Sequence, residues 1–313
     1  MATEMSQKVE YHKMGNFLVS NELFLDLIFN DKCNCNCDFC IAKTPAYSIE
    51  NIDIWKENLF KTFEIFDIRN IIVLGGEATI DPKFFEKLNI LEDIIKNKNV
   101  DNIILTTNGI MFRSEKFFEN LLKSCITTVN LSCMNNIKEK NDFFMKGNTL
   151  SRNEIFTIYN KLKENGRTMR LNTNVFKGNC DNVQDMEKYV YDFSGCCDII
   201  KFSPLMPTNM FGTIKEVENY TNEVSLSKNE IRNLYDNFSK DCKLITSNNV
   251  FGLVDYKELE IFNQRVILKY AQVEDTYDLD KVIPTLKLYN NGNLSNEWDY
   301  NKNILPKLEY LLD

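Results

Sequence analysis

The sequence predicts an α/β fold, a partial (β/α)6 TIM-like barrel followed by a small C-terminal α+β appendage. Short apolar runs alternate with longer amphipathic stretches between residues 20 and 210. The apolar runs are continuous, which is typical of parallel strands with both faces covered. About six such units are present, fewer than the eight of a closed barrel. We therefore expect an N-terminal extension (1–20), a barrel (21–212) and a C-terminal region (213–313).

The barrel strands are predicted by apolar runs that are short, rich in β-branched or aliphatic residues, and bounded by polar or turn residues. In chain order they are Glu22–Phe29, Asn70–Leu74, Asn102–Thr106, Thr127–Ser132, Met169–Phe176 and Asp198–Leu205. Helical periodicity in the intervening segments predicts the helices that cover the sheet. In chain order these are Ser48–Phe66, Pro82–Lys96, Lys116–Lys123, Asn153–Glu164 and Asn182–Asp192.

The last hundred residues have a different pattern. A helix is expected over Lys228–Lys240 and a strand over Gln264–Ala271. Asn291-Gly292 separates two strand-like runs, and this dipeptide is a strong signal for a β-hairpin because both central residues of a type I′ turn have positive φ. We expect a final helix over Ile304–Leu312. Together these elements make the predicted appendage.

Composition excludes several classes of protein. Hydrophobic residues make up 43% of the chain, which excludes a disordered or low-complexity protein. The net charge of −8 argues against a nucleic-acid backbone as the main partner. His12 is the single histidine, which argues against a Ser-His-Asp triad and against multi-histidine metal sites.

Ten cysteines require an explanation. The first sixteen residues lack the apolar core of a secretory signal, and no apolar run approaches the roughly 18–20 residues of a membrane span. We therefore expect a cytoplasmic protein with no membrane partner. Since the cytoplasm is reducing, clustered cysteines there are better interpreted as metal ligands or catalytic groups than as disulfides.

Four of the cysteines lie within eight residues after the first predicted strand. Cys33, Cys37 and Cys40 have the spacing Cys-x-x-x-Cys-x-x-Cys, and three thiolates on one short loop can hold an iron–sulfur cluster while one iron keeps an open position. An open position is typical of a catalytic metal centre. The alternative is a structural zinc site completed by Cys35, which would make the chain a non-enzymatic zinc-binding interaction protein.

This loop, with Phe39 directly before the last cysteine, resembles the signature of the radical S-adenosylmethionine (radical SAM) superfamily. The resemblance implies a barrel of the radical SAM type and an oxygen-sensitive enzyme. It also implies one [4Fe–4S] cluster held by Cys33, Cys37 and Cys40, with S-adenosylmethionine chelating the fourth iron. Cleavage of the sulfonium would release a 5′-deoxyadenosyl radical that abstracts hydrogen from a substrate.

Later landmarks follow in the order that the resemblance implies. Gly75-Gly76-Glu77 ends the second strand and resembles the Gly-Gly-Glu element of the family. Glycines there allow a close backbone approach to the methionyl ammonium, and Glu77 can accept a charge-assisted hydrogen bond from it. The resemblance implies further cofactor contacts at the ends of the later strands. They are Asn108, Ser132, Asn172, Asn174, Leu205 and Met206.

Three residues are candidates for roles toward the substrate. Arg170 and Lys201 are basic groups on the fifth and sixth strands that could meet a nucleotide, and the alternative is that they are solvated charges at the barrel rim. Cys133 follows Ser132 and is a hypothetical donor of a hydrogen atom to a substrate radical. Its alternative is a small hydrophobic packing residue.

Residues 20–212 most resemble the branch of the molybdenum-cofactor GTP 3′,8-cyclase, through Thr106–Gly109, Arg170–Thr173 and Leu205–Pro207. The C-terminal cysteines of that cyclase's second cluster and its Gly-Gly tail have no counterpart here, since Cys242 is the single cysteine beyond Cys197. We therefore expect a small nucleotide-like or carbohydrate substrate. The alternative is a ribosomal peptide that undergoes epimerisation or cross-linking. Either reaction requires a reductant such as flavodoxin or ferredoxin.

Overall fold

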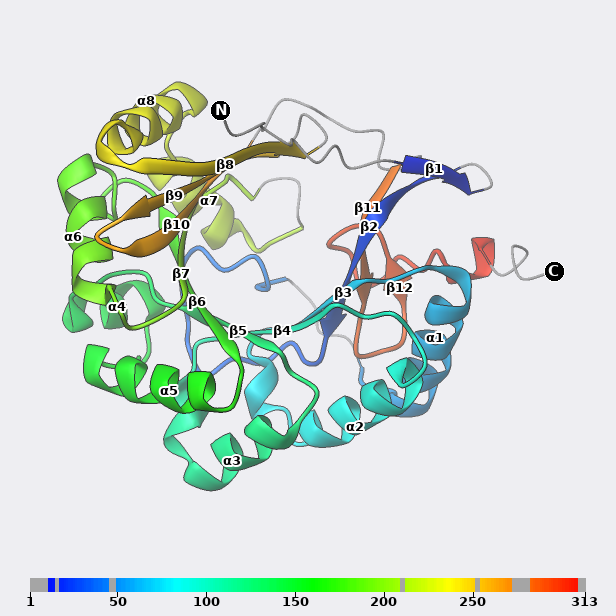
Figure 1. The fold of residues 1–313 in the computed structure, drawn as a ribbon. Helices are drawn as coiled ribbons and strands as arrows, with labels where there is room; N and C mark the ends of the chain where they lie inside the picture. Colours follow the sequence, from blue (N-terminus) through cyan, green and yellow to red (C-terminus); the bar gives the residue numbers. More distant parts are fainter. Residues whose placement is uncertain are drawn as a thin grey trace.

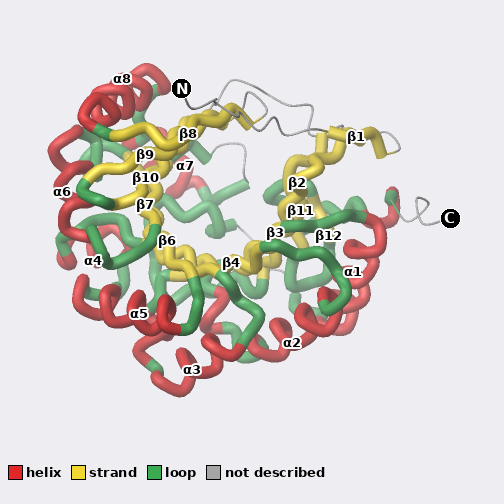
Figure 2. The backbone as a smooth tube through the Cα atoms, in the orientation of Figure 1, coloured by secondary structure: helices red, strands yellow, loops and turns green. Residues whose placement is uncertain are grey.

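The computed structural model describes residues 11–14, 17–44, 49–208, 212–250, 254–271 and 282–308. Their strands form one curved twelve-stranded sheet in the order β12-β11-β2-β3-β4-β5-β6-β7-β10-β9-β8, with β1 (Tyr11–Met14) paired to β2. Figure 1 shows the sheet as an arc with the helices on its outer side, and Figure 2 shows the same arrangement in the backbone trace. The predicted α/β class with a partial TIM-like barrel is confirmed.

The central strands run parallel in chain order. They are β2 (Phe17–Ile28), β3 (Asn70–Leu74), β4 (Asn102–Thr107), β5 (Thr128–Ser132), β6 (Thr168–Val175) and β7 (Ile199–Pro204). Burial alternates along β6, so Leu171 packs under the helices while Arg170 and Asn172 lie on the inner face of the sheet. This alternation decides which residues can reach a ligand inside the arc.

Helices follow the strands on the outer side. They are α1 (Ile52–Ile65), α2 (Phe84–Ile95), α3 (Glu115–Lys123), α4 (Lys138–Met145), α5 (Arg152–Glu164) and α6 (Val183–Phe193). Most begin at a residue whose side chain accepts a hydrogen bond from the first turn; at α5, Ser151 and Glu154 form a complete capping box. Short 3-10 turns η1 (Ala78–Ile80) and η2 (Ile110–Arg113) follow β3 and β4. Helix α4 is an element that the sequence analysis did not predict.

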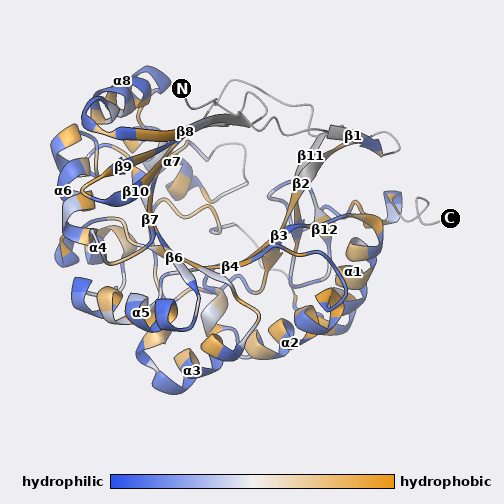
Figure 3. Ribbon diagram, viewed as in Figure 1, coloured by the Kyte–Doolittle hydropathy of each residue, from blue (hydrophilic) through white to orange (hydrophobic). Residues whose placement is uncertain are grey.

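The core lies between the outer face of the sheet and the helices. Leu25, Leu27 and Val73 contribute from the strands, and Trp55 and Leu59 from α1, all with essentially no exposed surface. Figure 3 shows both apolar and polar segments on these helices, as expected for helices that bury one face. No helix among the described residues combines the length and apolar character needed to cross a lipid bilayer.

The C-terminal region extends the barrel sheet at both of its ends. Helices α7 (Lys215–Val224) and α8 (Lys228–Phe238) and the short turn η3 (Ser239–Asp241) lead into β8 (Lys243–Val250), β9 (Val254–Ile261) and β10 (Gln264–Ala271). Strand β10 pairs in parallel with β7, and β11 (Val282–Leu288) pairs in parallel with β2. The predicted appendage therefore supplies strands to the same sheet, which local sequence patterns did not reveal.

The predicted hairpin is present, since β11 pairs antiparallel with β12 (Leu294–Ser295) across Asn291-Gly292. The final helix predicted over Ile304–Leu312 is wrong in its described part. A short 3-10 turn, η4 (Leu305–Lys307), stands there, and residues 309–313 lie outside the described residues. Pro306 lies inside this turn and cannot donate a backbone hydrogen bond, which disfavours a longer helix.

A buried lysine joins the end of β2 to the turn after β3. Lys87 of α2 has no exposed side-chain surface, and its Nζ donates to the Phe29 carbonyl (2.6 Å) and to Asp81 (2.6 Å). Its ammonium also lies 2.7 Å from the Glu50 carboxylate. This ion cluster therefore contacts the segments that follow β2 and β3, which form part of the site described below.

We expect Lys87→Ala to lower the free energy of unfolding by about 3–5 kcal/mol, because it leaves the buried carboxylate of Asp81 without its cation. Urea denaturation followed by circular dichroism measures this change. The control is Lys98→Ala, which removes a surface pair with Glu64 and is expected to cost less than about 1 kcal/mol. Equal effects of the two substitutions would contradict the structural role of Lys87.

Candidate functional site

A cavity of about 310 Å³ opens at the carboxyl ends of β3 to β6, where the cysteine loop crosses the strand ends. Apolar side chains, cysteines and a smaller share of polar groups line it. From the cysteine loop come Cys33, Cys35, Cys37, Phe39 and Cys40, and from the strand ends come Gly75, Gly76, Glu77, Asn108, Ser132 and Asn174. Ten of the residues that the sequence analysis proposed for the cluster or the cofactor thus meet at one place.

The cysteine loop is held against the turn after β3 by backbone hydrogen bonds. Gly76 N donates to the Asn30 carbonyl (2.8 Å), and Glu77 N donates to the Lys32 carbonyl (2.7 Å). A Cβ at Gly75 would lie 2.4 Å from the Asn30 carbonyl oxygen, and one at Gly76 would lie 2.3 Å from that of Lys32. The two glycines therefore permit the close approach of these two backbones, a role that the sequence analysis had not assigned to them.

The other side of the cysteine loop rests on the end of α4. Asn36 N donates to the Met145 carbonyl (3.1 Å), which also accepts from Cys37 Sγ (3.3 Å). A Cβ at Gly147 would lie 2.5 Å from Cys35 Sγ, so this position has no room for a side chain. The weakly amphipathic stretch that forms α4 gave no clear signal in the sequence, which is why this support was missed.

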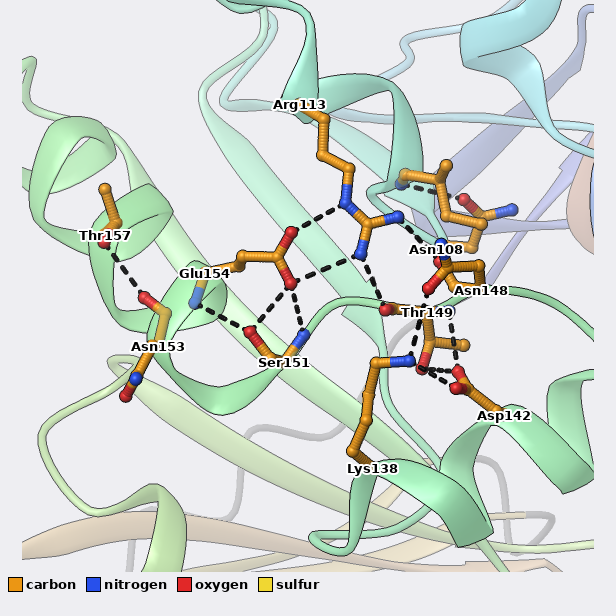
Figure 4. Close-up of polar contacts among 11 residues, drawn as sticks. Asn108, Arg113, Lys138, Asp142, Asn148, Thr149, Ser151, Asn153, Glu154 and Thr157 are labelled. Carbon is orange, nitrogen blue, oxygen red and sulfur yellow. Dashed lines mark hydrogen bonds and ion pairs between the residues drawn. The ribbon is translucent and has the colours of Figure 1, made fainter.

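Polar contacts hold α4 and the start of α5 in place (Figure 4). Arg113 donates to Glu154 (2.6 Å) and to the carbonyls of Asn148 and Thr149. The Arg113 guanidinium lowers the pKa of Glu154 to about 2, so the pair is charged at neutral pH. Asp142 of α4 accepts a hydrogen bond from Thr149 Oγ1 (2.7 Å), which ties α4 to the segment that leads into α5. These contacts place Met145 and Gly147 against the cysteine loop.

The four loop cysteines differ in environment. Cys33 is exposed, Cys37 and Cys40 are partly buried, and Cys35 is buried beside Met134 and Met145. A hydrogen bond from Cys35 lowers the pKa of Cys33 to about 7, while burial raises the pKa of Cys37 to about 12. None of the four forms a disulfide. Thiolates are the usual protein ligands of iron–sulfur clusters, so three free thiols on one cavity wall fit such a group.

Glu77 connects the strand ends to the cysteine loop. Its side chain is 3% exposed, and its Oε1 accepts hydrogen bonds from Thr107 Oγ1 (2.7 Å) and Thr79 Oγ1 (2.6 Å). Oε2 accepts from Asn108 N (2.7 Å), and the Asn108 amide donates to Asn34 Oδ1 (2.6 Å) in the cysteine loop. Burial raises the pKa of Glu77, and the hydrogen bonds oppose that shift. Oε2 retains the capacity to accept a further donor.

The remaining proposed cofactor residues are divided between the cavity and its surroundings. Phe39 lines the cavity and packs at 5.7 Å from the ring of Phe176. Leu205 is buried, and it lies outside the set that lines the cavity, as do Asn172 and Met206. The structure therefore brings Ser132 and Asn174 to the thiols and leaves Asn172, Leu205 and Met206 in the surrounding shell.

Cys133 does not reach the cavity. It is 1% exposed and belongs to the main core on the helix side of the sheet, where Tyr189 Oη donates to its carbonyl (2.7 Å). Side chains alternate along an extended chain, so Ser132 faces the cavity and Cys133 faces the opposite side. Burial raises the pKa of the Cys133 thiol to about 12. Its position favours the packing alternative over the proposed hydrogen donor.

Some cavity residues were not proposed from the sequence. They are Cys35, Ile41, Ala42, Leu74, Thr106, Thr107, Met134, Met145 and Trp298. Trp298 comes from beyond the C-terminal hairpin, and Lys287 Nζ lies 5.1 Å from the centre of its ring. The Thr106-Thr107 segment stood beside Asn108 in the sequence and could have been included, whereas Trp298 carried no local signal.

The sequence model of the radical SAM superfamily matches residues 27–190 of this chain, which is more than half of its length. The chain belongs to the radical SAM superfamily. As a radical SAM enzyme, it uses a [4Fe–4S] cluster and S-adenosylmethionine. The free thiols of Cys33, Cys37 and Cys40 suit such a cluster, and their assignment as its ligands stays a prediction. The non-enzymatic zinc alternative is wrong.

The chain is similar to curated GTP 3′,8-cyclases. It is 24% identical to the enzyme of Aquifex aeolicus over 175 residues, which cover 53% of this chain and 52% of that one. It is 28% identical to the enzyme of Clostridium acetobutylicum over 193 residues, covering 59% and 56%. The chain thus spans little more than half the length of these relatives.

Solved structures of radical SAM enzymes share the fold over a longer part of the chain. Streptococcus suis SuiB bound to S-adenosylmethionine has a TM-score of 0.63 at 16% identity, covering 95% of this chain and 67% of SuiB. The enzyme anSMEcpe with bound AdoMet and the Cp18Cys peptide has a TM-score of 0.52 at 18% identity, covering 70% and 60%. At these identities the likeness shows the fold.

We expect Cys33→Ser, Cys37→Ser and Cys40→Ser each to abolish cluster assembly, because each removes one thiolate ligand. Cys35→Ser is the matched control and is expected to keep the cluster, since Cys35 packs beside Met134 and Met145. Iron and sulfide content and the visible absorption of anaerobically reconstituted protein measure the result. A cluster retained in any of the first three variants would show that the ligand set is wrong.

Gly76→Ala is expected to lose most of the cluster, because its Cβ would collide with the Lys32 carbonyl and push the cysteine loop away. Overpacking of this kind costs about 1–3 kcal/mol. The control is Gly166→Ala, whose Cβ would meet nothing within 4 Å at φ +68° and which should cost about 1 kcal/mol while keeping full iron content. Equal iron content in both variants would contradict the proposed role of the close approach.

Proposed function

We propose that this radical SAM enzyme reductively cleaves S-adenosylmethionine at the cavity under the cysteine loop and abstracts a hydrogen atom from a substrate on the inner face of the barrel. The observation that carries this proposal is the meeting of three free thiols with Glu77, Asn108 and the strand-end polar groups at one cavity. That combination offers a ligand set for a cluster and acceptors for a charged cofactor.

The roles of the residues follow from their positions. Cys33, Cys37 and Cys40 would hold the [4Fe–4S] cluster, which would supply the one electron needed to cleave the sulfonium C–S bond of S-adenosylmethionine into methionine and a 5′-deoxyadenosyl radical. Glu77 offers Oε2 as an acceptor for the methionyl ammonium. Ser132 and Asn174, which both line the cavity, offer hydroxyl and amide groups to the polar parts of the cofactor.

The proposed reaction needs one electron and one hydrogen atom, and neither transfer requires a base from the protein. A low-potential reductant such as flavodoxin or ferredoxin donates the electron, and hydrogen transfer from the substrate gives 5′-deoxyadenosine and a substrate radical. All ten cysteines are free, which suits a reducing compartment. We therefore propose the cytoplasm as the place where the enzyme works.

For the substrate, we propose a small nucleotide-like or carbohydrate molecule. The similarity to GTP 3′,8-cyclases over about half the chain supports a small molecule. The alternative is a ribosomal peptide; SuiB has been solved with the precursor peptide SuiA, and anSMEcpe with peptides, at 13–20% identity to this chain. The two alternatives are distinguished by adding a small molecule or a peptide to the enzyme and measuring which of them increases the formation of 5′-deoxyadenosine.

Glu77→Gln is expected to lower the rate of 5′-deoxyadenosine formation by about 10–100-fold, because the hydrogen bond to the ammonium loses the charge of the carboxylate and an amide NH2 replaces one acceptor oxygen. The assay uses holoenzyme, S-adenosylmethionine and dithionite, with product measured by chromatography. Glu64→Gln, which alters an exposed carboxylate of α1, is the control. Wild-type enzyme with a full cluster that forms no 5′-deoxyadenosine would overturn the proposed function.

A further inference from the structure

Three basic side chains lie together on the inner face of neighbouring strands. Lys201 of β7 is opposite Asn172 on β6 and opposite Ile267 on β10. Arg170 and Lys269 lie two residues along the chain from these partners, so side-chain alternation puts them on the same face as Lys201. We call Arg170, Lys201 and Lys269 the inner cations. All three are partly exposed, so a ligand inside the arc can reach them.

The inner cations make no ion pairs with other described residues. Among the residues that the structure describes, neither Lys201 nor Lys269 has a hydrogen bond or an ion pair, and Arg170 donates from Nε to Asn172 Oδ1 alone (3.0 Å). Burial lowers the pKa of Arg170 to about 10. Burial, together with the charges of Lys269 and Arg170, holds the pKa of Lys201 well below its usual range, so an anion bound beside it would raise that pKa and favour the charged ammonium.

The described acidic residues nearby do not balance these charges. Glu258 of β9 is on the same face, and it is already paired with Arg265 at 2.6 Å. The carboxylate of Asp26 on β2 is shared between two lysines. It is opposite Lys287 of β11 in the sheet, and it also attracts Lys269. Partly buried like charges cost free energy unless an anion or a partner compensates them.

A buried acceptor next to Arg170 is a second, independent sign of a ligand. Asn130 of β5 is opposite Arg170 on β6 and is 2% exposed. Its amide nitrogen donates to Thr106 Oγ1 (3.4 Å), while its Oδ1 has no hydrogen-bond partner. Buried amide oxygens in proteins are nearly always hydrogen-bonded, so an unpartnered one on the inner face points to a donor supplied by a bound molecule, such as a hydroxyl group, and not to the phosphate oxygens themselves.

We propose that the inner cations bind a phosphate group of a small-molecule substrate; this deepens the proposed function and rests on it. A phosphate ester carries about −1.5 to −2 charges, which matches the uncompensated positive charge better than a single carboxylate does. Leu268 is opposite Phe202 in the sheet, so the next residue, Lys269, is at the height of Ser203. Ser203 is in turn opposite Asn174 on β6. A phosphate held there leaves the rest of the molecule near the cavity lined by Asn174.

The test titrates inorganic pyrophosphate into anaerobic holoenzyme by calorimetry, with succinate as a dicarboxylate probe. We expect saturable binding of pyrophosphate, weakened at least about tenfold by Lys201→Met and by Lys269→Met, because each removes a charge and keeps the apolar stem. The control is Lys257→Met on β9, whose lysine pairs with Asp236 on the outer side of the sheet; its binding should stay within about twofold.

Iron content and the thermal midpoint of each variant show whether it is folded, so a weakened affinity is read only in folded protein. Absence of saturable binding by the wild type, or unchanged affinity in both variants, would overturn the proposal. Succinate binding as tightly as pyrophosphate, with the same loss in the variants, would overturn the phosphate assignment in favour of a carboxylate. Formation of 5′-deoxyadenosine by the same preparation tests the proposed function separately, because it does not depend on the probe.

Discussion

The site depends on the backbone pairing between the cysteine loop and the turn after β3. Two hydrogen bonds, from Gly76 N to the Asn30 carbonyl and from Glu77 N to the Lys32 carbonyl, bring the loop directly over the strand ends. The glycines at 75 and 76 make this possible because a side chain at either would meet a carbonyl oxygen at under 2.5 Å. Because β2 and β3 are adjacent and parallel, the segments that leave their carboxyl ends begin side by side.

Burial of the Glu77 carboxylate completes this arrangement. A carboxylate removed from water is costly unless donors surround it, and donors from Thr79, Thr107 and Asn108 all converge on this one. Since Asn108 also donates to Asn34, the same carboxylate orders both the end of β4 and the cysteine loop. One residue thus serves as a structural centre of the site and as the proposed acceptor for the cofactor.

The alternation of side chains along the strands separates packing from binding. On β5, Asn130 and Ser132 face inward, while Val129 and Leu131 pack under the helices with Cys133 just beyond them. The same rule puts the inner cations on the inner face of β6, β7 and β10. Among the described residues, the outer face of the barrel sheet is therefore mainly apolar, and the inner face carries polar groups that include the three inner cations.

Much of this could be predicted from the sequence. The continuous apolar runs predicted the six central strands, and the spacing of Cys33, Cys37 and Cys40 predicted a metal centre. The resemblance to the radical SAM signature, together with Gly75-Gly76-Glu77, implied the cofactor site. These are local signals, since burial of a strand and the ligands of one loop depend on residues close together in the chain. Boundaries were less accurate; β2 begins at Phe17 rather than at Glu22.

The rest depended on contacts between residues distant in sequence. The sequence by itself determined the class of fold, the succession of six barrel strands along the chain and the residue types that suit a cluster, because these follow from hydrophobic pattern and spacing. Only the tertiary structure decided that β10 and β11 join the barrel sheet, that Trp298 reaches the cavity and Cys133 does not, and that Lys269 lies with Arg170 and Lys201. The reason is that strand pairing joins segments up to hundreds of residues apart, and no local pattern encodes which edge a strand will choose.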